Sequence, residues 1–191
     1  MKYIIITVGK THSGKTTFGK DMKEKLSDAI IFDSDELGDF LKTTYPWLYD
    51  EEILPMHTQE RNRGGQLQIE VRLKILEQAS KTQLPLIITA AHAHRSAREI
   101  CRNMAKENGR IMILVYFNYS EEVLLERIKK SERNKVPLVF SKTYENLLLK
   151  KQKEKFETPT PDETDIFFEV TDEISLEQTK QKILNLIHST S

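Results

Sequence analysis

The chain has 191 residues, of which 38 % are hydrophobic and 30 % charged, and its 29 basic residues balance 29 acidic ones. This length suits a single globular domain, and zero net charge disfavours long nucleic acid and anionic membranes as partners. No apolar run approaches the roughly 20 residues that span a bilayer. The only cysteine, Cys101, offers no disulfide framework, so we expect a cytoplasmic protein.

The first motif follows a β-branched run, Tyr3–Val8, which is typical of a buried parallel strand. Two glycines bracket four residues and a Lys-Thr pair follows, which is the phosphate-loop pattern G-x-x-x-x-G-K-T between strand and helix. We expect Lys15 to neutralise the β- and γ-phosphates of a nucleotide, and the Thr16 hydroxyl to ligate Mg²⁺. The alternative is a strand–helix turn with no ligand. The expected nucleotide-binding residues are Gly9, Lys10, Thr11, His12, Ser13, Gly14, Lys15, Thr16 and Thr17.

Strands and helices alternate along the rest of the chain. A helix capped by Ser34 or Asp35 is expected to end before Tyr45-Pro46-Trp47. The other expected helices cover 16–26, 57–81, 95–108, a segment that begins at Ser120, 144–156 and 176–187; the expected strands cover 3–8, 29–32, 84–89, 111–117 and 166–170. This alternation predicts an α/β fold of the three-layer P-loop NTPase type: one domain over 1–191, with a mostly parallel five-stranded sheet flanked by helices and a helical lid near 127–142.

The carboxyl ends of parallel strands meet at one rim, where ligands bind. The phosphate loop, Asp33, Asp35, the segment Thr89–Arg98 and Asn118 should all lie there. Asp35 is placed to accept the proton of an acceptor hydroxyl, and Asp33 to orient the acceptor or to hold magnesium-bound water. The alternative for this pair is a helix cap and a solvated acid.

Basic residues in and just after the helix that begins at Ser120 are candidates for a lid over the phosphates. Arg127 and Arg133 could offset the negative charge of transferring phosphate, and Lys130 shares a helical face with Arg127. The alternative is an ordinary solvated basic face.

Other polar residues carry weaker hypotheses. His92 and His94 could form a zinc pair, although they lack further ligands at a suitable spacing. Arg95 and Arg98 serve either an acidic substrate or the covering of a helix end. His57, Arg61 and Arg63 could line an acceptor pocket.

In motif order, most of the chain resembles the zeta-toxin and polynucleotide-kinase-like P-loop kinases, in particular the kinase domain of phage-type polynucleotide kinase. The matching segments are Gly9–Thr16, Asp35, Leu86–Arg98, Leu125–Pro137 and Lys155–Glu163. The resemblance implies that ATP and Mg²⁺ are the cofactors, that Asp35 is the general base and that lid arginines hold ATP. Two positions depart from the family: Gly38 stands where an arginine often contacts the acceptor, and Thr89 where an aspartate often ends the third strand.

The function expected from these residues is transfer of the γ-phosphate of ATP to a hydroxyl of a small-molecule or nucleic-acid acceptor. Its catalytic residues would be Lys15, Asp35, Arg127 and Arg133. A nucleotide switch or hydrolase is the alternative, but Thr89 offers neither a strong Walker B aspartate nor a water-orienting residue. A binding protein that has lost turnover is a third reading. No Asn-Lys-x-Asp guanine signature occurs, so ATP is preferred.

Overall fold

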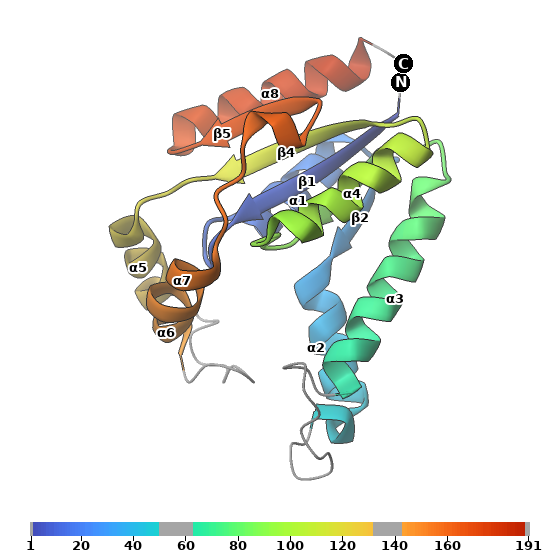
Figure 1. Cartoon of the computed structure of the whole chain (residues 1–191). Coiled ribbons are helices and arrows are strands. Elements are labelled where there is room, and N and C mark those ends of the chain that lie inside the picture. Colours follow the sequence, from blue (N-terminus) through green and yellow to red (C-terminus); the bar gives the residue numbers. More distant parts are fainter. Residues whose placement is uncertain (1, 50–62, 132–142, 190–191) are drawn as a thin grey trace.

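The computed structural model describes residues 2–49, 63–131 and 143–189. Within these residues five parallel strands form one sheet in the order β2-β3-β1-β4-β5 (Figure 1). The strands are β1 (Tyr3–Gly9), β2 (Ile30–Asp33), β3 (Leu86–Thr89), β4 (Ile111–Phe117) and β5 (Ile166–Val170). The predicted α/β class and five-stranded parallel sheet are therefore confirmed, with strand limits within two residues of those expected.

Helices connect the strands and flank the sheet (Figure 1). They are α1 (Lys15–Lys25), α2 (Ser34–Thr44), α3 (Arg63–Ser80), α4 (Arg95–Glu107), α5 (Glu121–Lys130), α6 (Tyr144–Asn146), α7 (Lys153–Lys155) and α8 (Glu173–His188). The segment expected as one helix over 144–156 is interrupted by a π-helical turn, Leu147–Gln152. Positions 57–62 of the expected third helix, and most of the expected lid, lie outside the described residues. None of the described helices is both long and apolar enough to cross a membrane.

Side chains of each central strand alternate between two apolar layers. On β1, Ile5 faces the layer that contains Phe18 and Met22 of α1 and several residues of α8. Ile4 and Ile6 face the opposite layer, built mainly from α3 and α4. Every residue of β1 is buried, because a parallel sheet covered on both faces leaves no side of a central strand to solvent.

All five strands run parallel, so their carboxyl ends lie along one edge of the sheet. β1 lies between β3 and β4, and the helices that follow β1 and β3 cover opposite faces of the sheet. Such a point, where the connections diverge, leaves a crevice outside the carboxyl ends of the strands. The loop after Gly9, Asp33 at the end of β2 and Thr89 at the end of β3 border this crevice.

Candidate active site

The phosphate loop joins β1 to α1 and depends on both of its glycines. A Cβ atom on Gly9 would lie 2.9 Å from Cβ of Phe117 and 3.0 Å from the Phe117 carbonyl oxygen, so β4 leaves no room for a side chain. Gly14 has φ of 94°, in the region that favours glycine. His12 also has a positive φ, 58°. The loop therefore keeps a strained, tightly curved backbone directly before the α1 N-terminus.

Lys15 lies folded back over this curve. Its ammonium group donates hydrogen bonds to the Lys10 carbonyl oxygen at 2.6 Å and to Oγ of Ser13 at 3.1 Å. The lysine thus places its charge inside the cradle formed by the loop and the N-terminus of α1. Backbone N–H groups, the positive end of a helix dipole and a lysine are the components of a phosphate-binding site.

Asp33 and Thr16 meet beside the loop. The Thr16 hydroxyl donates to Oδ2 of Asp33 at 2.8 Å, and the Thr89 hydroxyl donates to the same oxygen at 2.9 Å. The other carboxylate oxygen accepts the backbone N–H groups of Asp35 and Glu36, so Asp33 is the helix cap. The prediction that Ser34 or Asp35 caps α2 was wrong, because the capping residue stands just before the helix, at the end of β2.

This arrangement keeps Asp33 ionised. Burial opposes the charge, but the hydrogen bonds from Thr16, Thr89 and two backbone amides outweigh it, and the pKa of Asp33 is lowered from 3.8. The described residues contain no group of three His, Cys, Asp or Glu side chains that could hold a metal by themselves. Hard oxygen ligands at Thr16 and Asp33 nevertheless suit Mg²⁺, which commonly takes one or two protein oxygens and completes its shell with phosphate and water.

Asp35 lies in the first turn of α2 with its side chain exposed at the same rim. One turn further, Gly38 is buried against α3: a Cβ atom there would lie 2.7 Å from Nε2 of Gln68. Gln68 in turn donates to the Ser34 carbonyl oxygen at 2.9 Å. The amide of Gln68 therefore fills the space beside the position at which the resembling kinases often have an arginine.

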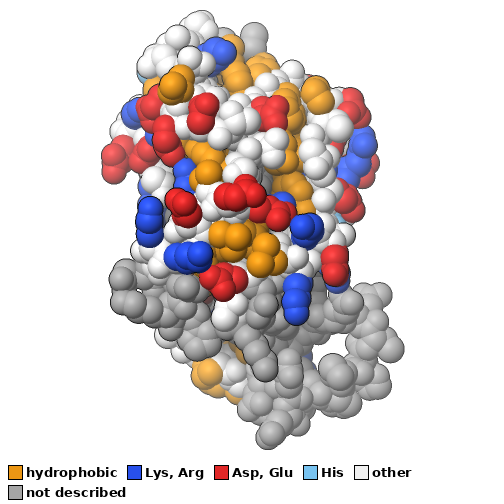
Figure 2. Space-filling view, turned by 90° about the vertical axis from the view of Figure 1, so that its left-hand side faces the viewer, with side chains coloured by type: hydrophobic (Ala, Val, Ile, Leu, Met, Phe, Trp, Pro, Cys, Tyr) orange, Lys and Arg blue, Asp and Glu red, His pale blue; other side chains and the backbone are white. Residues whose placement is uncertain are grey.

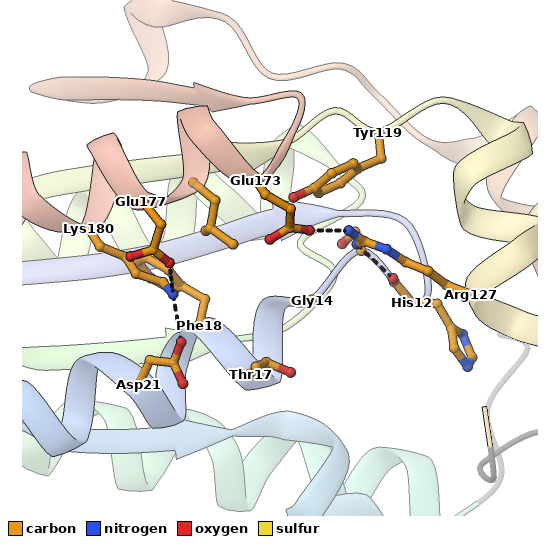
Figure 3. Close-up of a pocket in the computed structure, with 12 residues that line it drawn as sticks. His12, Gly14, Thr17, Phe18, Asp21, Tyr119, Arg127, Glu173, Glu177 and Lys180 are labelled. Atoms are coloured by element: carbon orange, nitrogen blue, oxygen red, sulfur yellow. Dashed lines mark hydrogen bonds and ion pairs between the residues drawn. The ribbon is translucent and has the colours of Figure 1, made fainter. Parts of the chain in front are cut away.

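A cavity of about 410 Å³ opens on the other side of the loop, between α1 and α8 (Figure 3). Arg127 lies at one end, where it pairs with Glu173 at 2.8 Å and donates to the His12 carbonyl oxygen at 3.5 Å. Its guanidinium carbon is 4.0 Å from the centre of the Tyr119 ring. Arg127 thus reaches the phosphate loop from α5.

The opposite end of this cavity is closed by an ion-pair cluster (Figure 3). Lys180 contacts Asp21 at 2.6 Å and Glu177 at 2.7 Å. Burial disfavours its charge, but the two carboxylates outweigh burial and raise the pKa of Lys180. Leu176 and Phe18 also line the cavity, so a planar base between its ends would meet apolar side chains. No sequence motif links α8 to the phosphate loop, so the part that Lys180 and Glu177 take in this cavity could not be predicted from the sequence.

Other predicted residues have different positions. Arg133 lies outside the described residues, as do His57 and Arg61. Lys130 is 81 % exposed, and its ammonium group pairs at 4.0 Å with Glu126, one turn earlier on the same helix. It is not among the residues that line the cavity beside Arg127.

Arg98 is buried rather than open to a substrate. Its guanidinium group pairs with Glu163 at 2.6 Å and donates to the carbonyl oxygens of His92 and Glu157. Of the two roles considered for Arg98, binding an acidic substrate is therefore wrong. Arg95 pairs on the surface with Asp162 at 2.8 Å.

The two histidines considered for zinc do not converge. His92 is buried and bonds through Nδ1 to the Thr7 carbonyl oxygen at 2.8 Å, whereas His94 is exposed and lies 3.5 Å from Glu157. Burial lowers the pKa of His92 to about 4, and the charges of Arg72, Arg98 and Lys15 act in the same direction. His92 is thus a neutral structural residue behind the phosphate loop.

A parallel sheet, a phosphate loop between β1 and α1, and an arginine over the adjoining cavity define a P-loop nucleotide-binding protein. The sequence profile described as AAA domain matches residues 4–159, and the chain belongs to this family. Curated proteins that it matches by sequence are named as kinases. The chain is an ATP-dependent P-loop kinase that transfers a phosphoryl group to a hydroxyl acceptor.

Two curated relatives illustrate this membership. A "Probable gluconokinase" of Schizosaccharomyces pombe is 26 % identical over 190 residues, which cover 98 % of this chain and 89 % of the relative. A shikimate kinase of Caldicellulosiruptor bescii is 31 % identical over 134 residues, which cover 69 % of this chain and 67 % of the relative.

Solved structures share the fold along nearly the whole chain. A candidate kinase from Chloroflexus aurantiacus superimposes with a TM-score of 0.73 at 16 % identity, covering 100 % of this chain and 98 % of the other. A gluconokinase from Sinorhizobium meliloti gives 0.61 at 19 % identity, covering 98 % and 96 %.

Proposed function

We propose that this kinase phosphorylates a hydroxyl of a small hydroxy acid, with MgATP as donor. The observation that carries the proposal is the convergence of the phosphate loop with Asp33 and Asp35 at one rim of the sheet. In this proposal Lys15 holds the β- and γ-phosphates, and Asp35 orients the acceptor hydroxyl and takes its proton. Catalysis then consists mainly of positioning and charge neutralisation.

The metal has a matching place in the proposal. Thr16 and Asp33 would hold Mg²⁺ directly or through water, and the ion would neutralise charge on the β- and γ-phosphates. The two residues already share a hydrogen bond, so their oxygens are within one ion's reach of each other. The nucleoside would occupy the cavity between α1 and α8, with the Arg127 guanidinium across it.

Two observations favour an acidic acceptor. Gluconate and shikimate, the acceptors named for the two relatives, are both hydroxy acids. In this chain burial lowers the pKa of His92, in the segment that follows β3, and the positive charges of Arg72, Arg98 and Lys15 all act on it in the same direction. In the proposal Lys15 serves the phosphates and Arg72 of α3 is the acceptor-side cation, whereas Arg98 is buried against Glu163 and is given no part in acceptor binding.

A polynucleotide acceptor, which the narrower resemblance to phage-type polynucleotide kinase implies, has less support. Among the described residues on the face shown in Figure 2, acidic and basic side chains are interspersed and form no continuous basic strip. A strand of nucleic acid needs clustered lysine and arginine along its backbone. A cytoplasmic location is part of the proposal, because the reaction consumes ATP and Cys101 is a buried free thiol.

The test is ADP formation measured with gluconate, shikimate, their uncharged analogues and an oligonucleotide with a free 5′-hydroxyl. We expect turnover on hydroxy acids, a specific rise in acceptor KM in Arg72→Met, and a kcat about 10²–10⁴ lower in Asp35→Asn. Asp39→Asn is the matched control, since Asp39 lies on the same helix but is exposed and pairs only loosely with Lys42 at 3.9 Å. A rate that no acceptor changes would instead indicate a hydrolase, and unaltered kcat in Asp35→Asn would refute the base assignment.

A further inference from the structure

The start of the phosphate loop is tied to segments that lie far away in sequence. The N–H of Thr11 donates to Oε1 of Gln152 at 2.8 Å. Beside this bond, the Glu121 carboxylate forms ion pairs with two lysines. Its Oε1 lies 3.3 Å from Nζ of Lys10, and its Oε2 lies 3.5 Å from Nζ of Lys153. The first two variable residues of the loop are therefore held both from the start of α5 and from the end of the π-helical turn.

Gln152 and Lys15 act on the same peptide group. The peptide between Lys10 and Thr11 has its C=O bound by the Lys15 ammonium at 2.6 Å and its N–H bound by Gln152 at 2.8 Å. The three N–H donors of Lys15 would be shared between this carbonyl oxygen, Ser13 and the phosphates of a bound nucleotide, so the hold of Lys15 on the peptide would weaken when a nucleotide binds. Gln152 then remains as the group that fixes this peptide plane.

The backbone around the peptide makes such a restraint useful. Gly9 precedes it, and His12, at φ of 58°, follows it, so the chain on both sides adopts uncommon conformations. Strained residues of this kind persist only where surrounding contacts determine them. A rotation of the peptide between residues 10 and 11 would redirect the N–H groups that follow, which are those aimed at the phosphates.

The π-helical turn explains how Gln152 reaches the loop. Leu147–Gln152 winds more widely than an α-helix and ends at Gln152, which changes the direction of the side chain relative to a regular helix. Single π-turns within helices occur frequently at functional sites. Gln152, Lys153 and Lys10 also border a second cavity of about 270 Å³ beside the loop.

We infer that Gln152 is a positioning residue for ATP binding, which holds the Lys10–Thr11 peptide in place when Lys15 turns to the phosphates. The inference concerns the nucleotide side of the site, so MgADP binding tests it independently of the acceptor. Gln152→Met keeps the length of the side chain and removes the acceptor oxygen, whereas Gln152→Glu keeps an acceptor. Gln181→Met, on the exposed side of α8, is the control.

The experiment measures the Kd for MgADP, the KM values for both substrates, and hydrogen exchange of the Thr11 amide by NMR. We expect Gln152→Met to weaken MgADP about three- to tenfold and to speed Thr11 exchange, with an unchanged acceptor KM, because a single neutral hydrogen bond is lost. Gln152→Glu should restore slow exchange. An unchanged Kd for MgADP together with unchanged Thr11 exchange in Gln152→Met would overturn the inference. An equal rise in the KM values of both substrates that Gln152→Glu does not reverse would also overturn it.

Discussion

The hydroxyl of Thr16 donates a 2.8 Å hydrogen bond to Oδ2 of Asp33, which joins the first turn of α1 to the last residue of β2. This bond connects the phosphate-loop side of the site to the acceptor side. It also brings together the two oxygens that we propose for Mg²⁺. Thr89 reinforces the pair from β3 at 2.9 Å, where the resembling kinases often have a second aspartate.

Replacing Asp33 by Asn should raise the Mg²⁺ concentration needed for half-maximal activity by about tenfold or more, since the amide lacks the charge that attracts a hard cation. Titration of activity with MgCl₂ at saturating ATP measures this. Asp28→Asn, in the exposed turn before β2, should leave the Mg²⁺ dependence unchanged. Asp33 itself should stay ionised from pH 8 to pH 5, because its hydrogen bonds outweigh burial and lower its pKa from 3.8. A Mg²⁺ requirement that is identical in Asp33→Asn would remove this residue from the metal site.

Arg127→Met should weaken ATP binding about tenfold, because the guanidinium group contacts both the loop carbonyl of His12 and the wall of the cavity. Glu173→Gln should have a smaller effect, about two- to threefold, since Glu173 is 72 % exposed and its pair with Arg127 is screened by water. Calorimetric titration with an ATP analogue gives both values. Lys130→Met on the same helix is the control, and equal effects of Lys130→Met and Arg127→Met would contradict the assignment.

His92 should make the protein less stable in mild acid. Its pKa is about 4 when folded and 6.5 in the reference state, so between these values the unfolded chain binds the proton and the folded chain does not. Stability therefore falls as the pH decreases through this window, by about 3 kcal/mol in total at 1.36 kcal/mol per pKa unit. Asparagine tolerates the positive φ of this position, 42°, and does not titrate.

Urea unfolding of wild type and His92→Asn at pH 7.0, 5.5 and 4.5 isolates this contribution from the other histidines. The stability difference between the two proteins should shrink as the pH falls. A difference that is constant across the three pH values would show that His92 has the same pKa in the folded and unfolded protein, and a difference that grows would show that the folded protein holds the proton.

The buried pair of Arg98 and Glu163 should be far more important for stability than the exposed pair of Arg95 and Asp162. Arg98 is 1 % and Glu163 5 % exposed, so removing one partner leaves a buried charge uncompensated. Arg98→Met or Glu163→Gln should each cost about 3–5 kcal/mol. Arg95→Met and Asp162→Asn should each have little effect on stability, because both side chains are more than half exposed and water screens their pairing.

Denaturant unfolding of the four variants and the two double variants measures these costs. The Arg98/Glu163 double variant should lose less than the sum of its single variants, as interacting residues do. The pair's contribution should also decline when the pH falls below 4.5, since the pKa of Glu163 is lowered in the folded state: burial opposes ionisation, but the bonds from Arg98 and Thr160 exceed it. Additive costs would show that Arg98 and Glu163 do not interact as described.

Local sequence was sufficient for the strands and the phosphate loop. The apolar runs of β1 and β4 identify buried strands because a strand covered on both faces carries hydrophobic residues throughout. Gly9 and Gly14 identify the loop because their backbone and packing admit no side chain. These are short-range constraints, and each can be read within a few neighbouring residues.

Only the tertiary structure shows which residues Arg98 and Arg127 contact. Arg98 and Arg127 each lie on a helix that follows a strand, and their sequence surroundings do not distinguish them. Packing turns Arg98 inward to Glu163, 65 residues away, and places Arg127 opposite Glu173, 46 residues away. Such pairs depend on how each helix is rotated against the sheet, and that rotation results from the whole core rather than from local spacing. For the same reason the contact between Gln152 and Thr11, 141 residues apart, has no sequence motif.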